Sequence, residues 1–291
     1  MESREGMGSG MKKAVIYGAG GTGSKIYELI KDSVEVIAFV DSDSKKWGGN
    51  KCSLPINSVD WLIGAESQYD VIYIATLTGV YDVENKLLGL GIPVWKIDKT
   101  YAEISVKSRI LFLRRHAELI YKKNIVGSVA ECGVYRGDFA KEINRFFPDR
   151  KCYLFDTFEG FDSRDFEAEE KKSMIEGSEY LSETNVDIVI NKMPYMDMVE
   201  IRKGYFPDTL GNLEDDFVFV NLDMDLYCPT LEGLRYFYPR TVNDGVVLIH
   251  DYFSDAFPNI EKAVDDYERE LGKKLCKMPI GDDISIAIVK G

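Results

Sequence analysis

The strongest constraint on the fold is a pattern of apolar run, glycine-rich turn and amphipathic helix that occurs twice in the sequence. The first copy starts at Lys12 and reads KKAVIYGAGGTGSKIYELI, and the second, at residues 127–147, reads GSVAECGVYRGDFAKEINRFF. A short apolar run that ends in glycine and continues with helical spacing predicts a strand, a turn and a helix. Strands that alternate with helices in this way form parallel sheets. The pattern therefore predicts an α/β protein.

Each copy begins a separate series of predicted strands and helices. The first series is complete by about Tyr101, and the second starts with an amphipathic helix at 109–123. We therefore expect two Rossmann-type doubly wound domains, at residues 11–102 and 103–291, preceded by an expression leader at 1–10. Beyond the two copies, the predicted strands are 34–43, 70–76, 93–98, 151–156, 217–222, 245–249, 274–281 and 284–290. The other predicted helices are 80–91, 230–239 and 259–271.

Composition limits the function. Of the 291 residues, 45% are hydrophobic and 29% are charged, which is ordinary for a soluble globular protein. The net charge of −13 opposes binding to a nucleic-acid backbone. No run reaches the roughly 18 apolar residues that a membrane span needs, and no signal peptide is visible, so we expect a cytoplasmic protein. The five scattered cysteines form no CxxC pair and are expected to be buried free thiols.

Acidic side chains follow two of the most apolar runs, at the points where the predicted strands end. The run FVFVNL leads into Asp223 and Asp225, and the run VVLI leads into His250 and Asp251. Carboxylates and imidazole are the usual groups for metal binding and for proton transfer. One acid in such a place is often part of a solvated loop, but two strands with such ends predict a site.

The second glycine turn has an acid on either side. Gly133 and Gly137 lie between a strand and a helix, where the backbone approaches a ligand closely. Glu131 precedes the turn, and Asp156 ends the next strand about 20 residues further on, where a carboxylate can accept both hydroxyls of a ribose. This combination predicts a cofactor crevice. The alternative is that the glycines only allow the helix to pack tightly on the strand.

Five motifs follow one another in the second predicted domain: AECGVYRGDFA (130–140), YLFDTFEGF (153–161), GYFPDTL (204–210), LDMDLYCPTLEGL (222–234) and HDYF (250–253). In this order they resemble the macrocin O-methyltransferase family, which comprises sugar O-methyltransferases that depend on S-adenosylmethionine and a metal. The resemblance covers residues 129–254. It implies a seven-stranded class I methyltransferase sheet, whose antiparallel last strand matches the predicted strand pair at the end. It also implies methylation of a sugar hydroxyl in glycan or natural-product biosynthesis.

The same resemblance implies where the cofactor would bind. The implied S-adenosylmethionine-binding residues lie around the second glycine turn and the two strand ends next to it. They are Glu131, Gly133, Tyr135, Gly137, Asp156, Thr157, Phe158 and Asp223.

The acids at the two strand ends suit the chemistry of methyl transfer to a sugar. A sugar hydroxyl is a poor nucleophile, and a divalent cation lowers its pKa and fixes its orientation. Together with the resemblance, this chemistry predicts that Asp223, His250 and Asp251 bind Mg²⁺ or Mn²⁺ and that Asp225 is the general base. Other family members carry an acid at the position of His250. Imidazole favours softer ions than Mg²⁺, and His250 is alternatively the base, because its ordinary pKa lies near neutrality.

The first glycine turn, GAGGTG, has the GxGxxG spacing at Gly18, Gly20 and Gly23, and Asp41 ends the second predicted strand. The strand before the motif and the helix after it are the context that nucleotide binding requires. This segment is similar to small Rossmann-type domains attached to polysaccharide and nucleotide-sugar enzymes. We expect it to bind NAD or a nucleotide-sugar, or to dock a partner with an empty crevice.

Two other functions for the whole chain remain open. One is a non-catalytic nucleotide or nucleotide-sugar binding protein in which the acids are remnants. The other is an NAD-dependent oxidoreductase, for which the region of the first glycine turn offers only one Tyr-x-x-x-Lys spacing, Tyr27 and Lys31 in the predicted helix directly after the turn. No separate proton donor is found near this turn, which disfavours this function. The acid-rich segment 161–180 is predicted to be either a lid over the substrate or a solvated helix. The expected partner is a small sugar or nucleotide-sugar acceptor, and the expected assembly is a dimer or larger.

Overall fold

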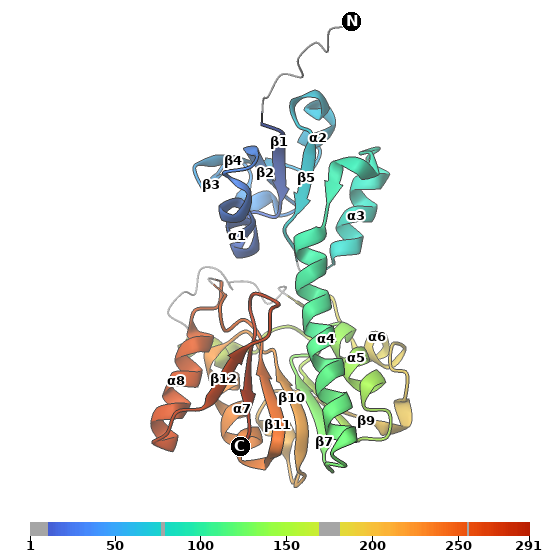
Figure 1. The fold of residues 1–291 in the computed structure, drawn as a ribbon, viewed down its shortest axis with the longest axis vertical. Coiled ribbons are helices and arrows are strands. Elements are labelled where there is room, and N and C mark those ends of the chain that lie inside the picture. Colours follow the sequence, from blue (N-terminus) through green and yellow to red (C-terminus); the bar gives the residue numbers. More distant parts are fainter. Residues whose placement is uncertain (1–10, 77–78, 169–180, 255) are drawn as a thin grey trace, which may run out of the picture. The chain divides into compact units, whose positions relative to one another are not determined.

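The computed structural model describes residues 11–76, 79–168, 181–254 and 256–291. The chain divides into two compact units, of which the first ends at Val106 and the second runs from Lys107 to Gly291 (Figure 1). This division falls inside helix α4 (Thr100–Lys122), a few residues after the expected domain boundary. Within the described ranges, no helix has both the length and the apolar character that a membrane crossing requires.

The first unit contains a six-stranded sheet in the order β3-β4-β2-β1-β5-β6, in which the β3–β4 pair is antiparallel and the other pairs are parallel. The predicted strand at 93–98 is wrong for most of its length, because Val94–Lys96 form a 3-10 turn and only Ile97–Asp98 pair with β5. The strands of the first unit are β1 (Lys13–Tyr17), β2 (Glu35–Asp41), β3 (Asn50–Lys51), β4 (Leu54–Ser58), β5 (Val71–Ile74) and β6 (Ile97–Asp98). Its helices include α1 (Gly21–Ile30), α2 (Trp61–Gly64) and α3 (Val80–Gly89).

The second unit contains a seven-stranded sheet in the order β12-β13-β11-β10-β7-β8-β9. Strand β13 is antiparallel to both of its neighbours, and the remaining pairs are parallel, as predicted. Its strands are β7 (Ser128–Cys132), β8 (Cys152–Asp156), β9 (Val199–Lys203), β10 (Phe217–Leu222), β11 (Thr241–Ile249), β12 (Cys276–Pro279) and β13 (Ile286–Val289). Its helices after α4 are α5 (Asp138–Phe146), α6 (Val186–Ile190), α7 (Tyr227–Arg240) and α8 (Asn259–Leu271).

Strand β10 is the centre of the second unit, and all six of its residues are buried. Phe217, Val220 and Leu222 pack in a core with residues of α7 and α8, whereas Val218 and Phe219 pack with residues of α4 and α5. A register shift between Phe217 and Phe219 explains why two successive side chains enter the same core. Helices cover both faces of β10, so a ligand can reach only the polar residues that follow the carboxyl end of the strand.

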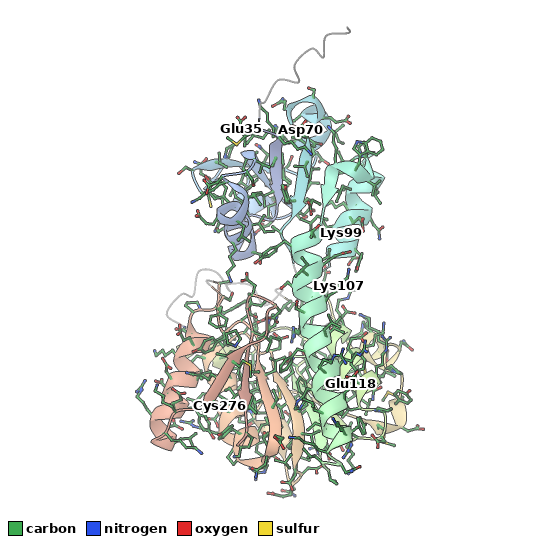
Figure 2. The ribbon with its side chains drawn as sticks, in the orientation of Figure 1. Glu35, Asp70, Lys99, Lys107, Glu118 and Cys276 are labelled. Atoms are coloured by element: carbon green, nitrogen blue, oxygen red, sulfur yellow. The ribbon has the colours of Figure 1, made fainter. Side chains whose placement is uncertain are left out.

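All five cysteines are free thiols, as predicted. Cys132 and Cys152 are buried on the neighbouring strands β7 and β8, and burial raises the pKa of both thiols. The expectation of burial is wrong for Cys276, which is exposed at the start of β12 (Figure 2), and Cys52 and Cys228 are only partly buried.

His116 is a buried structural residue of α4, and its Nε2 lies 2.9 Å from the carbonyl oxygen of Val218. Burial lowers the pKa of His116 below its ordinary value of 6.5, so the folded protein binds fewer protons here than the unfolded chain. The neutral form of His116 therefore contributes stability that is fully present above about pH 6.5. This contribution is lost as the pH falls and the histidine is protonated. We expect the urea midpoint to fall less between pH 7.5 and 5.5 in His116→Gln than in the wild type. Equal falls would contradict this assignment.

Candidate active site

Two neighbouring parallel strands bring the predicted acids together. Leu222 and Ile249 are paired in the β10–β11 ladder, so Asp223 and His250 leave the sheet side by side. The backbone N–H of His250 donates to the carbonyl oxygen of Leu222 over 3.0 Å, which holds the two strand ends together beyond the ladder. The chain then turns at Asp251, whose φ of 57° directs it away from the strand. The carboxyl edge of the sheet therefore carries three possible metal ligands.

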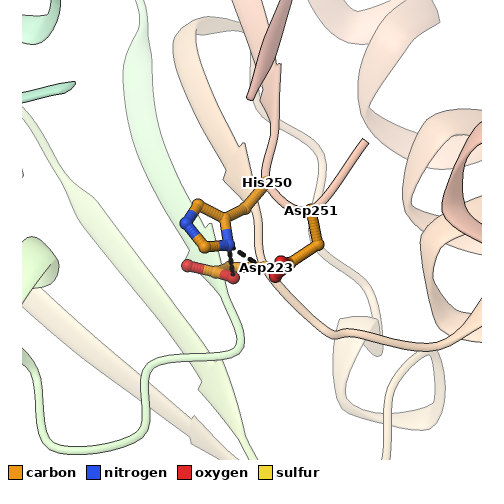
Figure 3. A group of neighbouring side chains, drawn as sticks. All are labelled: Asp223, His250 and Asp251. Atoms are coloured by element: carbon orange, nitrogen blue, oxygen red, sulfur yellow. Dashed lines mark hydrogen bonds and ion pairs between the residues drawn. The ribbon is translucent and has the colours of Figure 1, made fainter. Parts of the chain in front are cut away.

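His250 lies between the two carboxylates (Figure 3). Its Nδ1 is 2.9 Å from Asp223 Oδ1 and 2.6 Å from Asp251 Oδ2, and one ligand atom from each residue lies within 4.8 Å of the others. Adjacent ligands of an octahedral ion with bonds of about 2.1 Å are about 3 Å apart, so this spacing fits a small divalent cation. Burial and Arg109 lower the pKa of His250, but Asp223 and Asp251 outweigh them and raise it to about 10.

Asp225 lies beside this cluster in a turn with a φ of 62°. Burial and the nearby carboxylates of Asp251 and Asp223 raise the pKa of Asp225 well above its ordinary value. Without a cation, therefore, Asp225 gives up its proton less readily than an ordinary aspartic acid. A divalent cation reverses this balance, because it stabilises the ionised form of every carboxylate around it. Besides the spacing of the ligand atoms, the several buried acids are a second reason why Asp223, His250 and Asp251 fit a cation.

Two residues of the site were missed by the sequence analysis. Nη2 of Arg109, from α4, donates to Asp223 Oδ2 over 2.7 Å and to Asn221 Oδ1 over 3.0 Å. Nδ2 of Asn221 donates in turn to Glu131 Oε1 over 2.8 Å. Signals for both were present: Asn221 is the one amide in the apolar strand β10, and Arg109 lies one turn before the buried Leu113 on α4. Glu131 is thereby linked to the predicted metal ligand Asp223.

The second glycine turn lies against the backbone that carries Asp223. The N–H of Gly133 donates to the carbonyl oxygen of Phe155 over 2.9 Å, and a Cβ at Gly133 would lie 1.9 Å from the carbonyl oxygen of Asp223. Gly137 has a φ of 76° and precedes the first residue of α5. Gly133 therefore has a packing role, but it makes room for the backbone that follows β10 rather than for the expected packing of the helix on the strand.

Asp156 connects the turns that follow β7 and β8. Its Oδ2 accepts from the N–H groups of Val134 and Tyr135 over 2.7 and 2.8 Å, and its Oδ1 accepts from that of Phe158 over 2.6 Å. Thr157 donates its hydroxyl to the carbonyl oxygen of Gly160 over 2.5 Å. Asp156 was predicted to hold a ribose, and the structure gives it a role in shaping the turns as well. Its place at the end of β8, beside the turn after β7, keeps the ribose prediction open.

Glu131 is a buried acid, one of whose side-chain oxygens is unpaired within the described ranges. The side chain is 1% exposed, and its Oε2 has no hydrogen-bond partner in the described part of the chain. Burial is the main cause that raises its pKa, to about 8. A positively charged group, such as the ammonium of an amino-acid moiety, would stabilise the ionised form of Glu131 and pair with this buried oxygen.

The predicted residues of the first glycine turn also come together. Asp41 Oδ2 accepts from the N–H of Ala19 over 2.9 Å and from Lys46 Nζ over 3.0 Å. A Cβ at Gly23 would lie 2.0 Å from the carbonyl oxygen of Gly18, so this glycine allows α1 to pack on the turn, whereas a Cβ at Gly20 would meet nothing. A ribose would have to compete with Lys46 for Asp41, and nucleotide binding by Gly18, Gly20, Gly23 and Asp41 stays a prediction.

The strand order of the second unit, with its antiparallel last strand, is that of the class I methyltransferases, as predicted. Solved structures share this fold. The O-methyltransferase NovP superposes with a TM-score of 0.56 at 24% identity, over 63% of this chain and 79% of NovP. The calicheamicin methyltransferase CalS11 superposes with a TM-score of 0.50 at 15% identity, over 74% of this chain and 87% of CalS11.

The sequence identifies the family within this class. Residues 83–281 match the macrocin-O-methyltransferase family, so the chain belongs to this family, as predicted. Demethyldecarbamoylnovobiocin O-methyltransferase of Streptomyces niveus is 26% identical over 171 residues, which are 55% of this chain and 64% of that relative. The match thus spans less than two thirds of the relative's length. Residues 10–98 match a second family, described as C2185-like, N-terminal.

Proposed function

We propose that this protein transfers a methyl group from S-adenosylmethionine to a sugar hydroxyl, with a divalent cation held by Asp223, His250 and Asp251. The observation that carries the proposal is the convergence of these three side chains beside the glycine turn of a macrocin O-methyltransferase family member. The relative from Streptomyces niveus is named for O-methylation of demethyldecarbamoylnovobiocin, which supports oxygen as the methyl acceptor. A sugar as the acceptor follows from the motif resemblance in residues 129–254.

Residues around the turn after β7 support a site for the cofactor. Glu131 Oε2 is available to the ammonium of S-adenosylmethionine, and Asp156 lies at the strand end that faces a ribose in this fold. Tyr135, Thr157 and Phe158 belong to the two turns that Asp156 connects. S-adenosylmethionine supplies an activated methyl group, and the role of these side chains is to hold that group in line with the acceptor oxygen.

The metal cluster supports a role in activating the acceptor. A bound divalent cation supplies Lewis acidity that lowers the pKa of a coordinated hydroxyl. Nδ1 of His250 lies close to both carboxylates, which hold a proton on this nitrogen. A cation bound among the three side chains would displace that proton, and the neutral imidazole would then be a metal ligand rather than the base. Asp225 is then the proposed general base, because it adjoins Asp223 and Asp251 and its carboxyl group ionises more readily once a cation compensates the local negative charge.

Calorimetric titration of S-adenosylmethionine and of its demethylated product tests this function. Each ligand is added to the full-length protein, with and without Mg²⁺ or Mn²⁺. We expect micromolar binding of both ligands, because the strand order is that of class I methyltransferases and Glu131 Oε2 has no hydrogen-bond partner among the described residues. Binding should be followed by metal-dependent methylation of a sugar acceptor. Absence of binding under every metal condition would contradict the proposal and favour a non-catalytic nucleotide-binding protein.

A further inference from the structure

We infer that Arg109 is a positioning residue that fixes Asp223 as a one-oxygen metal ligand. This inference rests on the proposed metal site. Arg109 touches none of the proposed reacting groups and acts through Asp223. It lies 114 residues before Asp223 in the sequence, and no motif of the resemblance includes it.

The guanidinium of Arg109 is held on two sides. It lies 4.0 Å from the centre of the Phe139 ring, on α5, and its side chain is only 13% exposed. On β10, its Nη2 donates to Asn221 and to Asp223 at once. Asn221 is itself fixed, because its amide nitrogen donates to Glu131. Because the Phe139 ring and Asn221 hold the guanidinium independently of Asp223, Arg109 can orient the Asp223 carboxylate.

The contact divides the two oxygens of Asp223 between two tasks. Oδ2 accepts from Arg109 over 2.7 Å, and Oδ1 faces His250 Nδ1 over 2.9 Å. A carboxylate oxygen held by a guanidinium is a poorer ligand than its free neighbour, so Asp223 offers mainly Oδ1 to a cation. Arg109 therefore sets the orientation of Asp223 and disfavours binding of the ion through both of its oxygens. Groups that orient a metal ligand in this way typically contribute a factor of about 10 to 100 to metal affinity.

Mn²⁺ titration, followed by the electron paramagnetic resonance signal of free Mn²⁺, tests the inference without turnover. The main variant is Arg109→Lys, which keeps the positive charge and removes the planar fork. We expect its Mn²⁺ affinity to be about 10 to 100 times weaker than that of the wild type. Arg114→Lys on the same helix is the matched control, because Arg114 is 49% exposed and pairs with Glu118 (labelled in Figure 2). It should bind Mn²⁺ like the wild type.

A second variant guards against misfolding of the first. Phe139→Leu leaves all charges in place and removes the ring under the guanidinium, and we expect about two to ten times weaker Mn²⁺ binding. Thermal midpoints measured without Mn²⁺ report the structural effect separately. Wild-type affinity in both Arg109→Lys and Phe139→Leu would overturn the inference while the metal site stands. A wild-type protein that binds no Mn²⁺ would overturn the proposed metal site, and the inference with it.

Discussion

Replacement of Asp251 by asparagine is expected to lower the turnover number for methyl transfer by about 100-fold or more. The substitution keeps the size of the side chain but removes the charge that faces His250 Nδ1 over 2.6 Å. An amide oxygen is a weaker ligand than a carboxylate, so the cation is bound less tightly and polarises the acceptor less. Turnover is measured with saturating S-adenosylmethionine, a sugar acceptor and Mn²⁺ or Mg²⁺.

Cofactor binding separates this effect from general damage to the protein. Asp251 follows β11, whereas Asp156 and Gly133 shape the turns after β8 and β7, so calorimetric affinity for S-adenosylmethionine should stay within about twofold. Asp244→Asn is the control on the same strand, because Asp244 is 54% exposed and pairs with Lys123. Full metal-dependent activity in Asp251→Asn would remove Asp251 from the metal site.

Replacement of Gly133 by alanine is expected to lower the free energy of unfolding by about 4 kcal/mol or more. The new Cβ would lie 1.9 Å from the carbonyl oxygen of Asp223, and both atoms belong to backbone segments that the sheet fixes. The φ of 84° at Gly133 adds a conformational cost for any residue with a side chain. Urea unfolding of the wild type and the variant measures the loss.

Alanine substitutions at two other glycines separate the steric clash with Asp223 from the cost of a positive φ. Gly137 also has a positive φ, but its Cβ would meet only Val189, at 3.1 Å, so Gly137→Ala should cost about 1–2 kcal/mol. A Cβ at Gly20 would meet nothing, and Gly20→Ala should change the stability by less than about 1 kcal/mol. Equal losses for Gly133→Ala and Gly137→Ala would show that the approach of Asp223 is unimportant.

Sequence patterns predicted the long, buried elements and the meeting of the two strand ends. Strand β10 and strand β11 contain continuous apolar runs, and parallel neighbours must end at the same edge, so the sequence alone placed Asp223 and His250 together. Helix α8 was predicted at its observed bounds because its apolar residues have strict helical spacing.

The short edge elements were harder to predict. Strand β9 completes the sheet at its β8 edge, but only Val199 and Ile201 alternate with polar residues in its sequence VEIRK, and two apolar residues are too few to predict a strand. Strand β4 has a single buried residue, Ile56, so its sequence also lacks a clear strand pattern. Such strands form because a neighbouring strand offers hydrogen-bond partners, and this information is not local.

Polar contacts between distant segments were also beyond prediction. Arg109 and Asn221 are 112 residues apart, and their contact depends on how α4 packs on the sheet. The bonds from Val134 and Tyr135 to Asp156 depend on the backbone geometry of a turn, which the motif does not encode. Residue types at strand ends therefore indicate which groups can act, whereas their orientation follows from tertiary packing.

The position of Arg109 in α4 bears on how the protein can be divided for expression. The two compact units separate between Val106 and Lys107, but a fragment that begins at Lys107 would place Arg109 in the first turn of a helix. First turns fray, because their N–H groups have no partners within the helix. A recombinant second unit should therefore keep residues 100–106 as a helical leader, even though they fold with the other unit.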